Sequence, residues 1–183
     1  MFPQISVCPS RPFAVVDADA LHALAVRPEA LSSLRACDVL TPHPGEAATL
    51  LHTTPARVQA DRFEALAGLQ RLAPSVWVLK GAGTLIGTEG RPMTVAPYAE
   101  PNLAVGGSGD VLAGCLGTLM AQTAAYPSED CERSSHLAAC LAVHLHARAG
   151  ALLRAAFPQR GNTATDIAET LPRARAEGAG HGA

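Results

Sequence analysis

Residues 105–114, Val-Gly-Gly-Ser-Gly-Asp-Val-Leu-Ala-Gly, constrain the fold more than any other part of this chain. Three glycines fall within four positions, and an apolar stretch with helical spacing follows Asp110. Glycine lets the backbone turn sharply and approach a ligand closely. A helix that begins behind the glycines points its free N–H groups and the positive end of its dipole at that ligand. The run therefore predicts a site for an anion, usually phosphate.

Asp110 needs a separate explanation, because a carboxylate in such a site would repel phosphate. It is a candidate general base that takes a proton from a hydroxyl group attacking the phosphate. Alternatively, it only stabilises the helix dipole. The run is not a Walker A loop, since no Gly-Lys-Ser/Thr follows, and no clear strand leads into it as in a dinucleotide fingerprint. Taken alone, it leaves a phosphate site and an ordinary Gly-rich turn as equal alternatives.

Short apolar runs alternate with helical patterns along the chain. The expected strands are 13–17, 38–41 and 76–80, followed by a hairpin of 84–87 and 92–96. The first expected helix begins near Asp19, and the others cover 45–51, 55–72, 110–124, 134–156 and 163–171. In the helix over 55–72, the spacing predicts an apolar face of Phe63, Leu66, Ala67 and Gln70. This alternation predicts an α/β fold with a mostly parallel, doubly wound sheet and flanking helices. Residues 173–183 are expected to form a flexible tail.

Composition narrows the class of protein. The chain has 183 residues, 48% of them hydrophobic and 16% charged, which suits one globular domain with a real core. The net charge of −2, without a block of Lys or Arg, makes nucleic acid an unfavourable partner. Five cysteines, including Cys8, without a Cys-x-x-Cys spacing predict reduced thiols in a cytosol rather than disulfides or zinc. We expect no membrane-spanning segment and no signal peptide.

Four ordered segments resemble the ADP-dependent NAD(P)H-hydrate dehydratases of the ribokinase-like superfamily. They are Val16-Asp-Ala-Asp-Ala-Leu21, Leu40-Thr-Pro-His-Pro-Gly-Glu46, Val78-Leu-Lys-Gly-Ala-Gly-Thr-Leu-Ile86 and Pro101–Gly114. Four motifs in order are more specific than one, and the similarity covers about Pro12 to Pro172. The resemblance implies a ribokinase-like domain over 1–172. We expect this domain to be incomplete on its N-terminal side, because the chain begins only about a dozen residues before the first motif.

The resemblance also implies an activity, the ADP-dependent dehydration of the S-form of NAD(P)H hydrate to NAD(P)H, with AMP and phosphate released. Asp110 would deprotonate the hydrate, whose oxygen attacks the β-phosphate of ADP, and Mg²⁺ would screen the phosphate charge. The expected protein is a cytoplasmic homo-oligomer without nucleic-acid or membrane partners. Two other functions remain open, a ribokinase-like kinase that phosphorylates an alcohol and a non-catalytic nucleotide-binding remnant.

The candidate site residues lie in the matched motifs. By resemblance, His43 and Asp110 bind the hydrate and Asp110 is catalytic. Lys80 and Thr84 can reach phosphate oxygens, and the glycines between them let a nucleotide lie close. The predicted nucleotide-binding residues are Lys80, Gly81, Ala82, Gly83, Thr84, Gly107, Ser108 and Gly109, the last three through their N–H groups. No metal ligand is assigned.

Other polar residues have alternative interpretations. Glu46 either acts through the magnesium–phosphate network or stabilises the N-terminus of a helix. Asp17 and Asp19 could line the same cleft, although Asp19 is equally well explained as a helix cap. His144 and His146 are two residues apart, so they face different ways on a helix, and we interpret them as packing or surface residues rather than metal ligands.

Overall fold

The computed structural model describes residues 13–124, 130–158 and 160–179. The predictions for Cys8, for a signal peptide in the first residues and for the tail beyond 179 lie outside these described residues.

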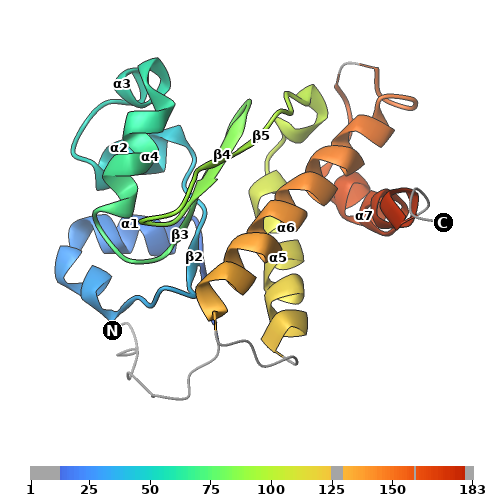
Figure 1. Ribbon diagram of the computed structural model, residues 1–183. Coiled ribbons are helices and arrows are strands. Elements are labelled where there is room, and N and C mark those ends of the chain that lie inside the picture. Colours follow the sequence, from blue (N-terminus) through green and yellow to red (C-terminus); the bar gives the residue numbers. More distant parts are fainter. Residues whose placement is uncertain (1–12, 125–129, 159, 180–183) are drawn as a thin grey trace.

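A five-stranded sheet forms the middle layer of the described chain (Figure 1). Its strands, in spatial order, are β1 (Val15–Val16), β2 (Val39–Leu40), β3 (Val76–Leu79), β4 (Thr84–Gly87) and β5 (Thr94–Ala96). β1, β2 and β3 run parallel, whereas β3, β4 and β5 pair antiparallel. The α/β class and the predicted hairpin of β4 and β5 are therefore confirmed, and the sheet is mixed rather than mostly parallel.

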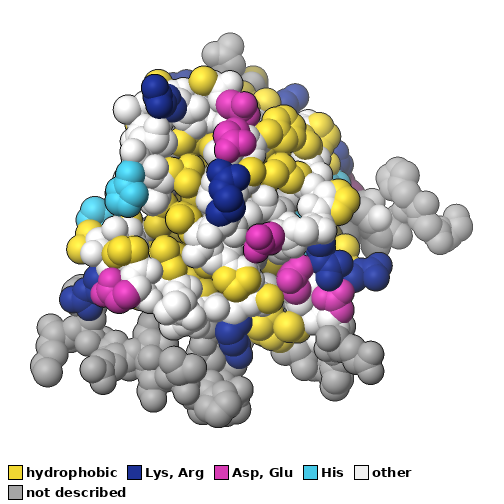
Figure 2. Space-filling model, turned by 60° about the vertical axis from the view of Figure 1, so that its left-hand side comes forward, with side chains coloured by type: hydrophobic (Ala, Val, Ile, Leu, Met, Phe, Trp, Pro, Cys, Tyr) yellow, Lys and Arg dark blue, Asp and Glu magenta, His cyan; other side chains and the backbone are white. Residues whose placement is uncertain are grey.

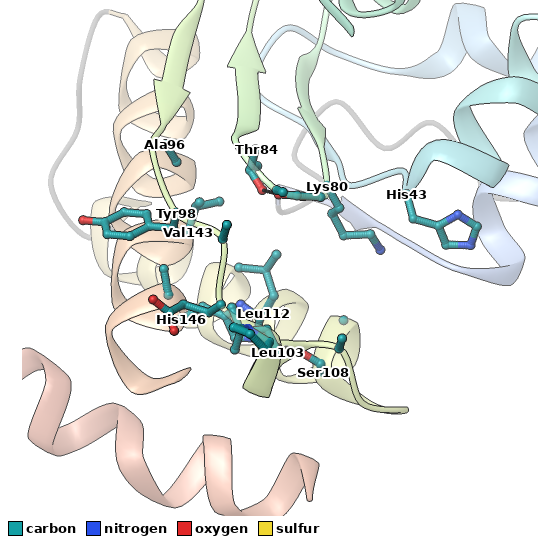
Figure 3. Close-up of a pocket in the computed structure, with 18 of the residues that line it drawn as sticks. His43, Lys80, Thr84, Ala96, Tyr98, Leu103, Ser108, Leu112, Val143 and His146 are labelled. Atoms are coloured by element: carbon teal, nitrogen blue, oxygen red, sulfur yellow. Dashed lines mark hydrogen bonds between the residues drawn. The ribbon is translucent and has the colours of Figure 1, made fainter. Parts of the chain in front are cut away.

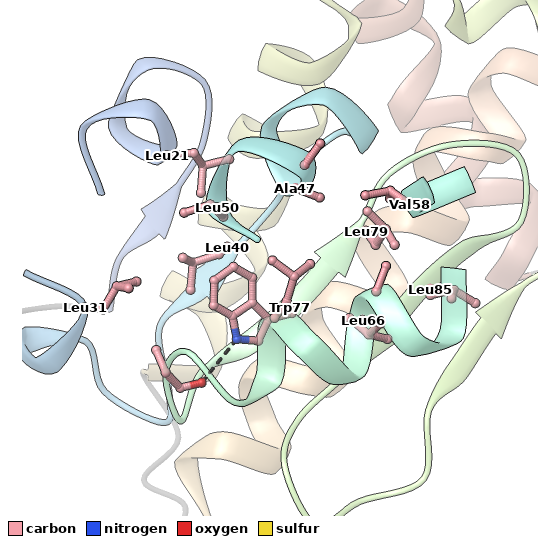
Figure 4. Close-up of a cluster of buried hydrophobic side chains, with 14 residues drawn as sticks. Leu21, Leu31, Leu40, Ala47, Leu50, Val58, Leu66, Trp77, Leu79 and Leu85 are labelled. Carbon is pink, nitrogen blue, oxygen red and sulfur yellow. Dashed lines mark hydrogen bonds between the residues drawn. The ribbon is translucent and has the colours of Figure 1, made fainter. Parts of the chain in front are cut away.

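The helices of the first half of the chain cover one face of this sheet (Figure 1). They are α1 (Asp19–Val26), the 3-10 helix η1 (Pro28–Ser33), α2 (Pro44–Leu50), α3 (Pro55–Ala60) and α4 (Arg62–Gln70). Leu40, Trp77 and Leu79 point from the strands into this layer, because alternate residues of a strand face the same side. Figure 4 shows Trp77 at the centre of the cluster, where its indole Nε1 donates to the Ala73 carbonyl at 3.2 Å.

The second face of the sheet is covered by the long helices of the C-terminal half. These are α5 (Ser108–Ala124) and α6 (Cys131–Leu153), with α7 (Ala164–Ala179) packed outside them and the short 3-10 helix η2 (Pro101–Leu103) leading into α5. Val39, Val76 and Val78 face this layer from the strands. Each face of the sheet thus has its own hydrophobic core, and the carboxyl ends of β1, β2 and β3 lie along one edge of the sheet.

Two sequence-based expectations about helices are wrong. The single helix expected over 55–72 is broken at Asp61, whose backbone is extended and whose carboxylate accepts the Glu64 N–H at 2.9 Å as the N-cap of α4. As a result the buried face of α4 is Ala65, Leu66, Leu69 and Gln70, whereas Phe63 is exposed. The last expected helix, over 163–171, is longer in the structure, since α7 continues through Pro172 as far as Ala179.

Helix α6 also differs from expectation, since it is long and apolar enough to cross a membrane by length and composition alone. Just over half of its most apolar window, 56%, is buried inside the fold. It contacts β3, β4 and β5 on one side and α5 and α7 on others. Its apolar character is therefore accounted for by its place in the core of the C-terminal layer.

Candidate functional site

The predicted anion-binding loop leads directly into α5. Gly107 has a φ of 83°, a conformation that glycine adopts without a steric penalty. A Cβ atom at Gly107 would also lie only 3.0 Å from the Cβ atom of Ala164, where α7 begins. Both the turn and the close approach of α7 therefore require glycine here, and they fix where α5 starts.

Only part of the predicted set of amide donors remains available at this helix end. The Ser108 N–H donates to the Val105 carbonyl at 3.2 Å, so this amide is engaged within the turn, in contrast to the prediction. Gly109 belongs to the first turn of α5, whose N–H groups have no partner inside the helix. The polar group that Ser108 can offer to a ligand is consequently its hydroxyl.

Lys80, at the end of β3, lies in a cluster of charged side chains at the carboxyl edge of the sheet. Its Nζ atom is 2.7 Å from Asp17 Oδ1 and 3.8 Å from Glu46 Oε2, and all three side chains are less than a fifth exposed. A Cβ atom at Gly109 would lie 3.5 Å from Lys80 Nζ and 3.6 Å from Asp17 Oδ2. The start of α5 thus faces the ends of β1 and β3, where parallel sheets commonly bind ligands.

Asp17 is followed by a backbone conformation that the sequence does not signal. Ala18 has a φ of 51°, which is uncommon for a residue other than glycine and marks local strain. Ala18 rather than Asp19 is the N-cap of α1, so the interpretation of Asp19 as a helix cap is wrong. Asp19 is exposed in the first helical turn, whereas Asp17 is directed at Lys80.

The loop from Lys80 to Thr84 is held from behind by Arg62, a residue that sequence analysis missed. The Arg62 guanidinium donates to the carbonyls of Leu79 at 3.0 Å and Gly83 at 3.3 Å. Burial lowers its pKa from the usual value. A Cβ atom at Gly81, which has a φ of 136°, would lie 3.0 Å from this guanidinium. Nothing in the sequence around Arg62 distinguishes it from an ordinary surface arginine.

His43 is oriented by a capping box at the N-terminus of α2. Its Nδ1 accepts hydrogen bonds from the backbone N–H groups of Gly45 at 2.9 Å and Glu46 at 3.2 Å, and Glu46 Oε2 accepts the His43 N–H at 2.7 Å. Because Nδ1 accepts, the proton of the neutral ring is on Nε2. Glu46 therefore stabilises the helix N-terminus and also lies near Lys80, so its position fits both of its alternative roles.

One pocket of about 600 Å³ brings most of the predicted residues together. Figure 3 shows Lys80 and Thr84 reaching it from β3 and β4, and Val143 and His146 reaching it from α6. The predicted residues that line it are His43, Lys80, Gly81, Ala82, Thr84, Ser108 and Gly109. Its apolar wall is formed by Ala96, Tyr98, Leu103, Leu112, Val143 and Ala147. The pocket is therefore lined by both polar and apolar side chains.

Three predicted residues are not part of this lining. Gly83 and Gly107 shape the loops beside it. Asp110 is exposed in the first turn of α5, directly after the pocket-lining Gly109. A carboxylate at this position can reach a reactant that extends beyond the pocket. Among the described residues, no group of three or more His, Cys, Asp or Glu side chains is arranged to hold a metal ion.

His146 is a second residue whose importance the sequence did not indicate. It is buried in the pocket wall, with its Nε2 3.1 Å from the Ser108 hydroxyl. Burial, together with the positive charge of Lys80, lowers the pKa of His146 to about 4. His144 is exposed and its Nδ1 lies 2.7 Å from the Tyr98 hydroxyl. The expectation that the two histidines face different ways is confirmed, yet no spacing rule connects residue 146 with residue 108.

The chain is similar to known proteins in both sequence and structure. A family model described as NAD(P)H-hydrate dehydratase matches residues 6–173. A bifunctional NAD(P)H-hydrate repair enzyme of Coxiella burnetii is 41% identical over 153 residues, which are 84% of this chain and 29% of that protein. An ADP-dependent (S)-NAD(P)H-hydrate dehydratase of Neisseria meningitidis is 44% identical over 110 residues, which are 59% of this chain and 37% of that protein.

A solved structure shares the fold as well. It is the ADP/ATP-dependent NAD(P)H-hydrate dehydratase from Bacillus subtilis, co-crystallised with ATP and Mg²⁺ and soaked with CoA. The superposition has a TM-score of 0.68 at 26% identity and covers 89% of this chain and 55% of the Bacillus protein. The ribokinase-like fold is thereby confirmed. The chain spans about a third of the length of the curated relatives it matches and about half of the solved structure.

Proposed function

Because the chain belongs to the NAD(P)H-hydrate dehydratase family, we propose that its site serves the ADP-dependent dehydration of the S-form of NAD(P)H hydrate to NAD(P)H. The observation that carries this proposal is the shared pocket. It joins the loop after β3 with the N-terminus of α5 and leaves Asp110 immediately beside it. Nucleotide-binding and acid–base groups thus meet at one edge of the sheet.

In this proposal ADP occupies the pocket with its phosphates against the polar lining residues. Lys80 and Thr84 line the pocket, as do Ser108 with its hydroxyl and Gly109 with its N–H group. The adenine ring packs against the apolar lining residues, among which Tyr98, Val143 and Leu112 offer hydrophobic contacts. A volume of about 600 Å³ is within the range that small-molecule sites span.

Asp110 acts as the general base. It removes the proton from the hydroxyl group of the hydrate, and the resulting oxygen attacks the β-phosphorus of ADP while the bond to AMP breaks. The phosphorylated hydrate then loses inorganic phosphate, which is a far better leaving group than hydroxide, and a proton leaves the adjacent ring carbon, so that the double bond of the reduced nicotinamide ring is restored. The N–H groups at the start of α5 stabilise the negative charge on the transferring phosphoryl group.

The protein can supply only some of the ligands that Mg²⁺ needs at this site. The nearby carboxylates of Asp17, Glu46 and Asp110 supply the hard oxygen atoms that Mg²⁺ prefers, and Mg²⁺ usually retains several waters and binds substrate phosphates. The ion would therefore be held mainly by ADP, with one or two of these carboxylates completing its shell. When bound, it neutralises phosphate charge.

The proposal includes a cytoplasmic homo-oligomer with no nucleic-acid or membrane partner. The described cysteines, Cys37, Cys115, Cys131 and Cys140, are free thiols, in keeping with a reducing compartment. On the face shown in Figure 2, Lys and Arg side chains are interspersed with acidic and hydrophobic ones. Leu137 and Leu141 are exposed along α6 and offer an apolar surface for self-association.

The products of the reaction test this function. The protein is incubated with the S-form of NADH hydrate, ADP and Mg²⁺, and nicotinamide absorbance, AMP and phosphate are followed together. We expect NADH, AMP and phosphate in equal amounts, and no reaction of the R-form. AMP with a stable phosphate ester and no NADH would identify a kinase instead. ADP binding without any product would identify a nucleotide-binding protein, and either result would overturn the proposal.

A further inference from the structure

A buried hydrogen bond connects α6 to the first residue of α5. His146 Nε2 and Ser108 Oγ are 3.1 Å apart, and the two residues are only 7% and 5% exposed. Both also line the pocket. The Ser108 amide is occupied by the Val105 carbonyl, so the hydroxyl is what Ser108 presents to a ligand. His146 is therefore in contact with the one polar group of Ser108 that remains to be oriented.

The protonation state of the ring limits how this bond can form. With a pKa near 4, His146 is neutral at physiological pH, so one ring nitrogen carries a proton and the other has a lone pair. A serine hydroxyl can donate one hydrogen bond and accept others. If Nε2 accepted the serine proton, the hydroxyl would present only lone pairs to the pocket, and these would repel phosphate oxygens. If Nε2–H donates instead, the serine proton is free.

We propose that His146 is a positioning residue, whose Nε2–H donates to Ser108 Oγ and so directs the Ser108 hydroxyl proton towards a phosphate oxygen of the bound nucleotide. The identity of that nucleotide as ADP rests on the proposed function. The role gives α6 a direct part in the geometry of the phosphate site, although the predicted phosphate-binding motif lies wholly before and within α5.

The same helix provides a matched control. His136 Nε2 lies 3.1 Å from the Thr94 hydroxyl, which is the same kind of bond at the same distance. This pair joins α6 to β5, and neither residue lines the pocket. Replacing His136 by leucine removes a comparable hydrogen bond from α6 without reaching the phosphate site.

Two measurements on the full chain test the proposal. The first is the tautomer of His146, read from nitrogen-15 chemical shifts of the imidazole rings at neutral pH. We expect the proton on Nε2, and a proton on Nδ1 would overturn the proposal whether or not ADP binds. The second is the dissociation constant of ADP, measured by calorimetry for His146→Leu, His146→Gln and Ser108→Ala.

We expect His146→Leu to weaken ADP binding about tenfold, the effect of one lost hydrogen bond. His146→Gln should restore most of the affinity, because its side-chain amide can also donate to Ser108. In the Ser108→Ala background, His146→Leu should cause no further loss. His136→Leu should leave the affinity unchanged. Circular dichroism and thermal unfolding show whether each variant is folded. If His146→Leu does not fold, the ADP affinities of Ser108→Ala and His146→Gln still test the proposal.

The outcomes separate this inference from the proposed function. If the unmodified chain does not bind ADP, the proposed function fails. If it binds ADP and His146→Leu binds equally well, the proposed function stands and the positioning role is refuted. An equal loss of affinity from His146→Leu in the presence and absence of the Ser108 hydroxyl would also refute it, because the effect would then not pass through Ser108.

Discussion

Replacing Arg62 by leucine should both destabilise the chain and weaken nucleotide binding. The guanidinium donates to the Leu79 carbonyl at 3.0 Å and the Gly83 carbonyl at 3.3 Å, and its Nη1 and Nη2 atoms both lie 3.4 Å from the Lys80 carbonyl. A hydrogen bond with a charged donor contributes about 1.5–3 kcal/mol. Since two of these contacts are long and the site is only part-buried, we expect the free energy of unfolding to fall by about 2 kcal/mol in all.

Urea denaturation measures this loss, and calorimetry measures the accompanying change in ADP affinity. Arg71→Leu is the matched control at the other end of α4. Arg71 pairs with Glu64 at 2.9 Å, but both side chains are more than 60% exposed, so this loss should stay below about 1 kcal/mol. Arg62→Lys should behave like Arg62→Leu, because an ammonium group cannot span the same set of carbonyls.

The expected change in ADP affinity is a decrease of about tenfold or more, because a loop that is no longer held must be ordered on binding. Unchanged ADP affinity in a measurably destabilised Arg62→Leu variant would refute the reasoning. It would mean that the loop after β3 keeps its shape without the guanidinium, or that it does not contact the nucleotide.

Three further perturbations follow from particular contacts. Gly150→Ala should lower the free energy of unfolding by about 1–3 kcal/mol, because its Cβ would lie 2.8 Å from Leu103 Cδ2. At Gly114 an added Cβ meets nothing within 4 Å, so Gly114→Ala should raise the free energy of unfolding by about 0.5–1 kcal/mol. Thermal or urea unfolding measures both changes. Burial and the neighbouring Cys131 raise the pKa of Cys37 to about 11. Iodoacetamide at pH 8 should therefore modify Cys37 more slowly than Cys131 in the native protein. Equal rates of modification, measured by peptide mass spectrometry, would contradict this. The pKa of His146 is lowered from 6.5 to about 4 by folding, so between pH 4 and pH 6.5 the unfolded chain binds more protons than the folded chain. About 3 kcal/mol of stability that is present above pH 6.5 should therefore be lost as the pH falls towards 4. Urea unfolding of His146→Gln should show a correspondingly smaller decline over this range than the unmodified chain, and parallel profiles would contradict the assignment.

The features that local pattern determines could be predicted from the sequence. The apolar run around Val78 and the turn residues between β4 and β5 fixed the strands and the hairpin, and the glycines at 106–109 placed the start of α5. The resemblance to NAD(P)H-hydrate dehydratases, carried by four ordered motifs, is confirmed by the family match. Most of the site residues that it named line the pocket, because those motifs lie at strand ends that converge on one edge of the sheet.

Features that depend on distant contacts could not be predicted. Arg62 is fixed to carbonyls that lie 17 to 21 residues further along the chain, and Ser108 and His146 are 38 residues apart. Neither relation leaves a spacing pattern. The prediction of a single helix over 55–72 failed for a different reason. An aspartate that caps a helix has the same sequence pattern as an aspartate on the helix surface. Only the structure shows that the Asp61 side chain accepts the Glu64 N–H. The roles assigned to the individual site residues remain predictions.

The central claim is that Asp110 serves the chemistry and not the binding of ADP. Its most direct test is to measure the turnover of the S-form of NADH hydrate and the dissociation constant of ADP, side by side, for the unmodified chain and for Asp110→Asn. The account predicts that turnover falls by about 10²–10⁴-fold while ADP affinity is retained, as expected for loss of a general base. Near-normal turnover by Asp110→Asn would contradict the account, because another group would then have to remove the proton.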